Sequence, residues 1–405
     1  MGKRALIDVP ILLVTAALVI FGVLMVYSAS ADFSYQMYGS ETYVFKRQLI
    51  WLGLGSLVAL LMTFLDYHFW RRLAVPAMLA ALGGLIIVLF IQDERLGAVR
   101  SLFSGSVQPS ELAKLVIVIY LSVWLYNRRD QLQDINFGLI PLGVILGLVG
   151  GFIGLQPDLS ALITVILLGI MMFFLAGGDL RQLVVVLLLG SVVGFIVLRS
   201  GIFPTGTERL GSFWVGLSNP LEYSEHVRRA LEAFVKGGWL GVGIGKSETK
   251  LFGLPFPHTD SVFAVVGEEM GALGASVLVV LYLLFMWRAL KIARRAPDQL
   301  GSLLAGGLGL WLVTEACINM AVMVGLMPFA GNALPFISAG GSNLLVTMTA
   351  VGIILNVSRL SEKKLEEQGK EPSYRAFVDL RRGDRRRRLS RSGRPAASDG
   401  GLSAN

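Results

Sequence analysis

A short polar run stands directly before one of the most apolar stretches of the chain. The sequence LPFPHTDSVFAVVGEEMG, residues 254–271, places Asp260 just ahead of an apolar segment that begins at Val262. A carboxylate there could serve as a general base at a boundary with water, because partial desolvation raises its pKa while nearby cations lower it. The same position would suit a helix cap, since a negative charge stabilises a helix N-terminus. His258 and Thr259 are candidates to support Asp260 in either role.

Two adjacent glutamates lie deeper in the same segment. Glu268 and Glu269 would come about two turns into a helix that starts near Val262. Neighbouring residues on a helix point about 100° apart, so at most one of them shares the side of Asp260, and Glu268 is the nearer. Ionisable groups in apolar surroundings carry protons, pair with a basic residue or fix packing. We expect a structural, supporting role for both.

A second polar group opens another apolar run, in the sequence VQPSELAKL. Pro109 suits a helix start, and Glu111 and Lys114 are three residues apart, so they can pair on one helix face. Capping of the helix N-terminus alone does not require an ion pair inside an apolar run. With Gln108, it is a candidate binding site for a phosphate group, which cations grip through charge-assisted hydrogen bonds. Further candidate cations predicted on the same side are Arg47, Arg100 and Arg209.

Glycine-rich segments supply two further candidates. In LPFISAGGSNLL, the glycines predict a turn into a helix with Ser342 as its N-cap, and amides at such a turn could bind an anion. The segment GGWLGVGIGKS resembles a phosphate-binding P-loop, but Leu240 stands where its first glycine belongs and no strand precedes it, so we reject that function. Glu315 and Asn319, four residues apart, are expected to serve helix packing.

Composition defines the protein class. Hydrophobic residues make up 54% of the 405 residues and charged residues only 16%, which is typical of an integral membrane protein. Cys317 is the only cysteine and the three histidines show no zinc-site spacing, so we predict no disulfide framework and no such metal site. Much of the net charge of +8 comes from the sequence RRGDRRRRLSRSGR near the C-terminus, which gives no reason to expect a nucleic-acid partner.

Ten apolar runs have about the length needed to cross a bilayer core of ~30 Å. Because backbone exposed to lipid must satisfy its own hydrogen bonds, each run is predicted to be a helix. In order, the runs cover residues 9–27, 49–65, 73–91, 112–126, 139–155, 159–176, 183–198, 262–287, 303–326 and 344–357. We therefore predict an all-α polytopic membrane protein with about ten transmembrane helices.

Basic residues in the short loops set the predicted orientation. They fall on one side under an even helix count, which places both termini in the cytoplasm. The opposite side receives one large extracytoplasmic loop, residues 199–260, between helices 7 and 8. Within it, residues 221–235 show the pattern of an amphipathic helix at the membrane surface. Residues 1–359 form the predicted transmembrane domain, and residues 360–405 a basic cytoplasmic tail expected to be disordered.

Several of these motifs together resemble one known family. VQPSELAKLVIVIYL, QPDLSALI, GGWLGVGIGKS, LPFPHTDSVFAVVGEEMG and LPFISAGGSNLL follow one another as in the SEDS family, the FtsW and RodA proteins of bacteria. The similarity extends from the first helix to about Arg359. The end of the first helix, the start of the second and the basic tail resemble FtsW more than RodA.

The resemblance implies a peptidoglycan glycosyltransferase that polymerises lipid II at the outer face of the bacterial cytoplasmic membrane, in cell division or cell-shape growth. It implies a class B penicillin-binding protein as partner, with other divisome or elongasome membrane proteins. Asp260 falls on the family's essential aspartate, the base in an inverting displacement. Arg47, Lys114 and Arg209 would hold the pyrophosphate, with Glu111 orienting Lys114. Mg²⁺ or Mn²⁺ is a candidate cofactor.

The chain departs from the usual family pattern near the loops. The departures are Ser101, Ala339, Asn343, His226 and Arg229. Two other function classes stay open on the residues alone. A lipid II flippase would depend most on Glu268, Glu269 and Glu315, because buried polar groups also serve transport. A scaffold that recruits the transpeptidase would tolerate Asp260→Asn.

Overall fold

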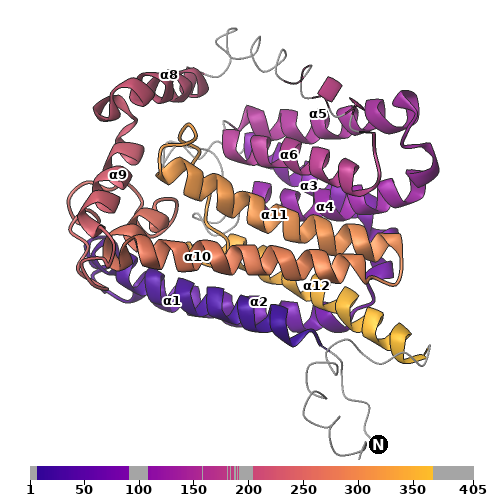
Figure 1. Cartoon of the computed structure of the whole chain (residues 1–405), viewed down its shortest axis with the longest axis horizontal. Helices are drawn as coiled ribbons and strands as arrows, with labels where there is room; N and C mark the ends of the chain where they lie inside the picture. The colour runs from indigo at the N-terminus through magenta and orange to yellow at the C-terminus, as the bar shows by residue number, and fades with distance from the viewer. Residues whose placement is uncertain are drawn as a thin grey trace, which may run out of the picture.

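The computed structural model describes residues 7–90, 108–156, 158–179, 181–182, 184–186, 188, 190 and 204–367. Every regular element in these ranges is a helix (Figure 1), so the all-α prediction is confirmed. The longer helices are α1 (Val9–Tyr38), α2 (Tyr43–Phe64), α3 (Trp70–Phe90), α4 (Pro109–Arg128), α5 (Ile140–Leu155), α6 (Leu159–Leu175), α8 (Pro204–Ser218), α9 (Glu225–Gly237), α10 (Val262–Arg294), α11 (Gln299–Met323) and α12 (Gly341–Glu367). The predicted tail lies almost wholly outside the described residues.

Eight helices in the described part of the chain are long and apolar enough to cross a membrane. They are α1, α2, α3, α4, α5, α10, α11 and α12. Helix α6 is apolar but shorter, and most of the run predicted at 183–198 lies outside the described residues. The chain is a multi-pass membrane protein, and the count of ten spans stays a prediction.

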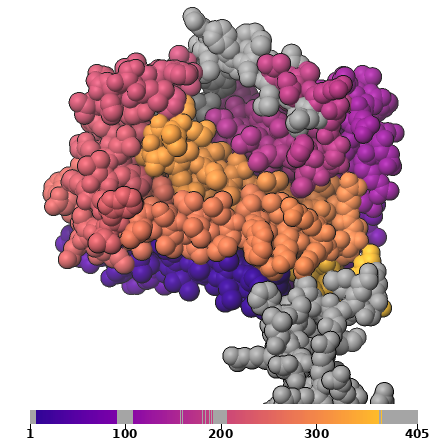
Figure 2. Space-filling model, in the orientation of Figure 1, coloured from indigo at the N-terminus to yellow at the C-terminus, as the bar shows by residue number. Residues whose placement is uncertain are grey.

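Three helices form the centre of the bundle. In the most apolar stretches of α4, α11 and α12, about four-fifths of the residues are buried, compared with a third or fewer in α1, α2, α3 and α10. Helix α11 contacts α4, α6, α10 and α12, while α2 packs along α12. Polar groups on α4, α11 and α12 are therefore enclosed by protein, and the outer helices present apolar side chains outward. Figure 2 shows α1, in indigo, below the orange α10 on this face of the molecule.

Aspartates cap several helices, as expected from their preference for helix N-termini. Asp8 accepts a hydrogen bond from the amide of Ile11 at 3.0 Å at the start of α1. Asp158 caps α6 through the amide of Ala161 at 3.2 Å. Asp298 caps α11 in the same way, through the amide of Gly301.

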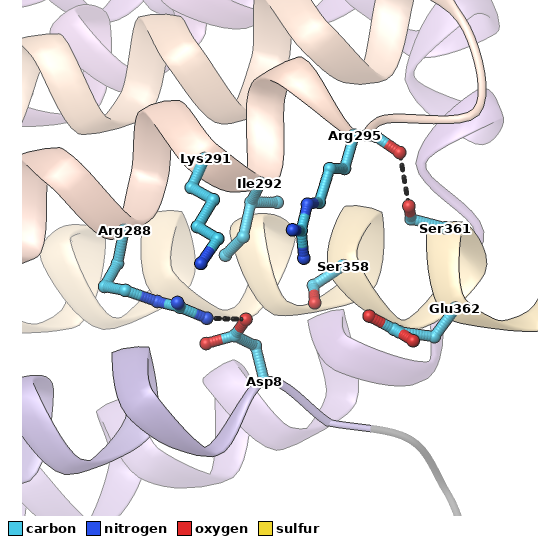
Figure 3. Close-up of a pocket in the computed structure, with 8 residues that line it drawn as sticks. All are labelled: Asp8, Arg288, Lys291, Ile292, Arg295, Ser358, Ser361 and Glu362. Carbon is cyan, nitrogen blue, oxygen red and sulfur yellow. Dashed lines mark hydrogen bonds and ion pairs between the residues drawn. The ribbon is translucent and has the colours of Figure 1, made fainter. Parts of the chain in front are cut away.

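The start of α1 and the end of α12 are both tied to the end of α10. Asp8 forms an ion pair with Arg288 of α10, and Ser361 of α12 donates to the main-chain oxygen of Arg295. Figure 3 shows the side chains of Lys291 and Arg295 pointing into the recess between these helices. This end of the bundle lies opposite to α9 (Figure 1), and we call the other end the α9 end.

Helix α9 occupies part of the predicted amphipathic segment, with two differences. It begins at Glu225, whereas Leu221 lies in a preceding 3₁₀ turn and is 71% exposed. Its buried face is formed by Val227, Ala230 and Ala233, and α10 packs against it. Another helix therefore covers this face, and the position of the segment at the membrane surface stays a prediction. Helix α8 was not predicted at all.

Helix α10 is interrupted at Gly271, which has φ 66° and ψ −170°. The loop that follows α9, residues 238–243, fills the interruption. The amides of Val242 and Gly243 donate to the main-chain oxygens of Glu268 and Glu269, at 2.9 and 3.0 Å. On the other side of the interruption, the amides of Ala272 and Leu273 donate to the oxygens of Gly238 and Trp239, at 2.9 and 3.2 Å.

Glycines permit this close backbone contact. A Cβ at Gly241 would come within 2.2 Å of the main-chain oxygen of Glu269, and one at Gly271 within 2.5 Å of the amide nitrogen of Gly241. Gly237 likewise lies against the oxygen of Gly267. We call residues 262–270 the half-helix and residues 238–243 the bridging loop, because the loop completes the hydrogen bonds of both parts of α10.

We expect Gly241→Ala to destabilise the protein more than Gly245→Ala. Both glycines have positive φ, 79° and 84°, which costs an alanine about 1–2 kcal/mol. Only Gly241 faces a neighbouring backbone, so its replacement adds an overpacking cost of about 1–3 kcal/mol. Thermal unfolding of the two purified variants measures the difference, and equal melting temperatures would contradict the bridging-loop geometry.

Candidate active site

Asp260 is half-buried at the start of the half-helix. The N-cap residue of α10 is Ser261, whose hydroxyl donates to the main-chain oxygen of Pro255 at 2.8 Å and makes no cap hydrogen bond. Gly331 lies against the carboxylate of Asp260, since a Cβ on Gly331 would come within 2.8 Å of Oδ2. The loop between α11 and α12 therefore forms one wall beside Asp260.

The same loop and α11 hold the backbone around Asp260. The amide of Ala339 donates to the oxygen of His258 at 2.8 Å, and the hydroxyl of Ser338 donates to the oxygen of Thr259 at 2.6 Å. Asn319 of α11 donates from Nδ2 to the oxygen of Asp260 at 2.8 Å. Three successive main-chain oxygens are thus fixed by groups that come from later in the chain.

The side chain of His258, next to this backbone, is a buried, neutral ring. It is 7% exposed and lies against Phe33 with ring centroids 4.4 Å apart. Burial lowers the pKa of His258 to about 4, because desolvation disfavours the imidazolium. At neutral pH it therefore adds no positive charge beside Asp260.

The predicted pair of Glu111 and Lys114 is present and completely enclosed. Lys114 Nζ lies 2.9 Å from Glu111 Oε1, and both residues are at most 6% exposed. Lys114 also contacts Glu315 of α11, and Asn343 of α12 donates to Glu111 Oε2 at 3.0 Å. One lysine is therefore shared by two carboxylates from two helices.

Glu315 was expected only to pack with Asn319, and its contact with Lys114 was missed. An acidic residue in an apolar run indicated that Glu315 needs a partner. Lys114 could not be identified as that partner because it is 201 positions away in the sequence. Glu315 and Asn319 lie one turn apart on α11, roughly 6 Å along its axis. Because Asn319 holds the backbone of Asp260 and Glu315 contacts Lys114, α11 links Asp260 to Lys114 through two residues one turn apart.

Gln108 and Ser342 join the starts of α4, α6 and α12. Gln108 Nε2 donates to Asp158 at 3.2 Å, as does Ser110. The amide of Gln108 donates to Ser342 Oγ at 3.3 Å. Ser342 lies inside the first turn of α12, which begins at Gly341, so its prediction as N-cap is wrong. Asp158 is a site residue that was missed, although its place in the sequence QPD, between two apolar runs, was a signal.

Glu268 and Glu269 hold the segment that follows the bridging loop. Glu268 accepts from the hydroxyl of Ser247 and from the amides of Glu248 and Thr249, at 3.0 and 3.2 Å. The segment that resembled a P-loop thus binds an internal carboxylate instead of a phosphate. Glu268 is 1% exposed, and its expected supporting role stays a prediction.

Glu269 forms the second attachment. Its Oε1 lies 2.8 Å from Lys250 Nζ, and Ser28 of α1 donates to the same carboxylate at 2.7 Å. The side chains of Lys250 and Glu269 are 5% and 0% exposed. The half-helix is therefore held at its inner end by backbone, by hydrogen bonds and by a buried ion pair.

The three candidate arginines have different surroundings. The guanidinium of Arg209 on α8 lies 5.2 Å from the ring centroid of Phe329, two residues before Gly331. Phe329 also stacks on His226, with centroids 4.1 Å apart. Burial first, and then the nearby Arg209, lower the pKa of His226 to about 4. Arg47 is half-buried on α2, and Arg100 lies outside the described residues.

The described residues contain no group of three His, Cys, Asp or Glu that could hold a metal ion. The donor set that the structure describes at this site, with one half-buried carboxylate and a lysine shared by two glutamates, does not fit a resident Mg²⁺ or Mn²⁺. The chemistry of the site is therefore derived from its side chains.

A protein-family model described as "Cell cycle protein", for FtsW, RodA and SpoVE, matches residues 9–363. The chain belongs to the FtsW/RodA/SpoVE family. A "Probable peptidoglycan glycosyltransferase FtsW" of Trichlorobacter lovleyi is 36% identical over 359 residues, covering 87% of this chain and 93% of that protein. The "Stage V sporulation protein E" of Bacillus subtilis is 33% identical over 367 residues, covering 89% and 99%.

Solved structures agree with this family assignment. The similar structures include one titled "Structural coordination of polymerization and crosslinking by a peptidoglycan synthase complex", with a TM-score of 0.71, 28% identity and coverage of 88% of this chain and 98% of that one. The rod shape determining protein RodA of Thermus thermophilus gives a TM-score of 0.63 at 28% identity, covering 88% and 98%. The predicted resemblance is thereby confirmed.

We expect Lys250→Met to destabilise the protein by about 3 kcal/mol, because it leaves the carboxylate of Glu269 buried without its partner charge. Lys236→Met is the matched control, since its pair with Glu248 is exposed, with 47% and 71% of the two side chains accessible, and should contribute less than ~1 kcal/mol. The double variant Lys250→Met/Glu269→Gln should recover part of the loss. The free energy of unfolding is measured for the wild type and the three variants. Equal values for Lys250→Met and Lys236→Met would contradict the prediction.

We expect acid to destabilise the protein through His258. Its folded pKa of about 4 lies below the unfolded value of about 6.5, so the unfolded state binds more protons between these values. Stability should therefore fall as pH decreases from about 6.5 to 4 and should not fall further through this group. His258→Gln should flatten the melting-temperature profile in that window. An unchanged slope would show that His258 is not the group responsible.

Proposed function

We propose that this protein is a peptidoglycan glycosyltransferase that polymerises lipid II, with Asp260 as general base. The observation that carries the proposal is the half-buried Asp260, whose backbone is fixed by Asn319, Ser338 and Ala339. Relatives with the FtsW name are described as probable peptidoglycan glycosyltransferases. Family membership and site geometry thus support the same reaction.

The reaction needs one base and positioned cations. Asp260 takes the proton from the 4-hydroxyl of the acceptor sugar while that oxygen attacks the anomeric carbon of the donor. The bond from that carbon to the pyrophosphate oxygen breaks, and its electron pair leaves with the polyprenyl pyrophosphate, so the configuration is inverted. Pyrophosphate is a good leaving group, hence the enzyme's main tasks are proton removal and orientation of the two sugars.

Lys114, Arg47 and Arg209 are the cations proposed to stabilise the leaving group. Glu111 orients Lys114, and Glu315 joins it in this role. Since Lys114 is shared between two carboxylates, pyrophosphate would compete with one of them for the ammonium group. Gln108, Ser342 and the more distant Arg100 complete the proposed phosphate-binding set, and the new contacts add Asp158 as the residue that orients Gln108.

We place the site at the outer face of the bacterial cytoplasmic membrane, with both termini inside. The basic loops favour this orientation, and lipid-linked precursors carry their sugars at a membrane surface. A class B penicillin-binding protein is the proposed partner. The similar structure of a peptidoglycan synthase that coordinates polymerization and crosslinking supports such an assembly.

The flippase alternative receives less support. It would depend on Glu268, Glu269 and Glu315 as groups along a path. Glu268 is bound by Ser247 and two amides, Glu269 by Ser28 and Lys250, and Glu315 by Lys114. Carboxylates engaged in this way suit fixed structure better than passage.

Asp260→Asn should reduce polymerisation of lipid II by at least ~100-fold, because the amide cannot accept the proton. The assay compares glycan strand formation by the purified variant and the wild type, with a penicillin-binding protein whose transpeptidase site is blocked. Asp32→Asn, which changes an exposed carboxylate on α1, is the matched control and should keep full activity. A fully active Asp260→Asn protein would exclude Asp260 as base.

A further inference from the structure

One face of α10 is apolar and exposed along most of its length beyond Gly271. Exposed side chains recur every three or four residues, which places them on one helix face. They are Leu273 (53% exposed), Val277 (53%), Val280 (51%), Leu284 (40%) and Trp287 (57%). In a multi-pass membrane protein, such a stripe faces lipid. We call these five residues the α10 stripe.

The stripe continues into the bridging loop. The amide of Leu273, its first member, donates to the main-chain oxygen of Trp239 at 3.2 Å. Trp239 is 77% exposed, Leu240 80%, and Val235 at the end of α9 82%. We call these last three residues the loop patch. In Figure 1, α9 and the loop after it lie at one end of α10, where the stripe ends.

Two helices locate the interruption along the membrane normal. Gly271 lies 23 residues from Arg294 at the end of α10, roughly 35 Å along the helix. Ser28, which binds Glu269 beside the interruption, lies 19 residues from Val9 at the start of α1, roughly 29 Å. Both lengths match a hydrocarbon core of ~30 Å, so the loop patch lies at its boundary on the α9 end.

Tryptophans mark both ends of the stripe. Trp287 lies beside Arg288 and Lys291, whose cationic groups are 5.5 and 5.1 Å from its ring centroid. Trp239 lies at the other end, bonded to Leu273, which is 14 residues or roughly 21 Å along the helix from Trp287. Exposed tryptophans are enriched at the two interfaces between membrane and water, where one part of the ring is apolar and the other can hydrogen-bond.

We propose that Val235, Trp239 and Leu240 insert into the outer leaflet of the phospholipid bilayer as a membrane anchor. The partner is lipid, because the loop patch is continuous with the lipid-facing stripe through a backbone hydrogen bond. The glycine-rich segment GGWLGVGIG thereby has two roles. Its backbone completes both parts of α10, while its apolar side chains enter the bilayer.

The anchor sets the depth of Asp260. The bridging loop is bonded to the half-helix, and Asp260 lies at the start of that half-helix, so insertion of the loop patch fixes how far Asp260 stands from the membrane surface. This consequence rests on the proposed function, in which both sugars are carried by lipids and are therefore held at a limited height above the bilayer.

The test places a nitroxide spin label at Leu240 through Leu240→Cys in a Cys317→Ser background. The protein is held in nanodiscs of phosphatidylethanolamine and phosphatidylglycerol, without any partner protein. Val277→Cys, on the α10 stripe, is the lipid control, and Glu222→Cys, exposed in the turn before α9, is the water control. Accessibility to oxygen, which concentrates in lipid, is compared with accessibility to a water-soluble nickel chelate.

The label at Leu240 should resemble that at Val277, with oxygen accessibility several-fold above nickel accessibility. A label that resembles Glu222 would overturn the proposal and would mean that the loop patch awaits a protein partner. The spin-label measurement does not depend on catalysis. A wild-type protein that failed to polymerise lipid II would refute the proposed function and leave the spin-label result unchanged.

Discussion

The structure depends on the cost of unpaired backbone groups in apolar surroundings, which is several kcal/mol for each group. An interruption inside α10 is stable only because the bridging loop supplies donors to one part of the helix and acceptors to the other. Gly241 and Gly271 allow the two backbones to approach closely enough. The half-helix, the loop and Asp260 consequently form one structural unit, which no single helix could provide.

Buried charges obey the same requirement and connect distant elements. Lys114 joins α4 to α11, Lys250 joins the segment after the bridging loop to α10, and Arg288 joins α10 to the start of α1. A buried charge without a partner is far more costly than a buried pair. These pairs therefore restrict how the helices can shift, and they do so on both sides of the membrane-spanning region.

Sequence reasoning succeeded where the signal is local. Long apolar runs predict membrane helices, Pro109 predicts the start of α4, and the spacing of Glu111 and Lys114 predicts their contact. It failed where the signal is distant or not distinctive. Nothing near Glu315 reveals Lys114 as its partner, and Gly271 resembles many of the 47 glycines of the chain, so the interruption of α10 could not be predicted. The predicted start of α12 was wrong by two positions because two adjacent glycines make it ambiguous.

A general base must reach its substrate and still be held in place, and these demands conflict if the side chain itself is enclosed. Lys114, which is not a base, has its side chain buried between two carboxylates. At Asp260 the main chain resolves the conflict. The oxygens of residues 258, 259 and 260 accept hydrogen bonds from Ala339, Ser338 and Asn319, so the main chain carries the positional accuracy. The carboxylate can then stay half-exposed, as the proposed proton transfer from a sugar hydroxyl would require.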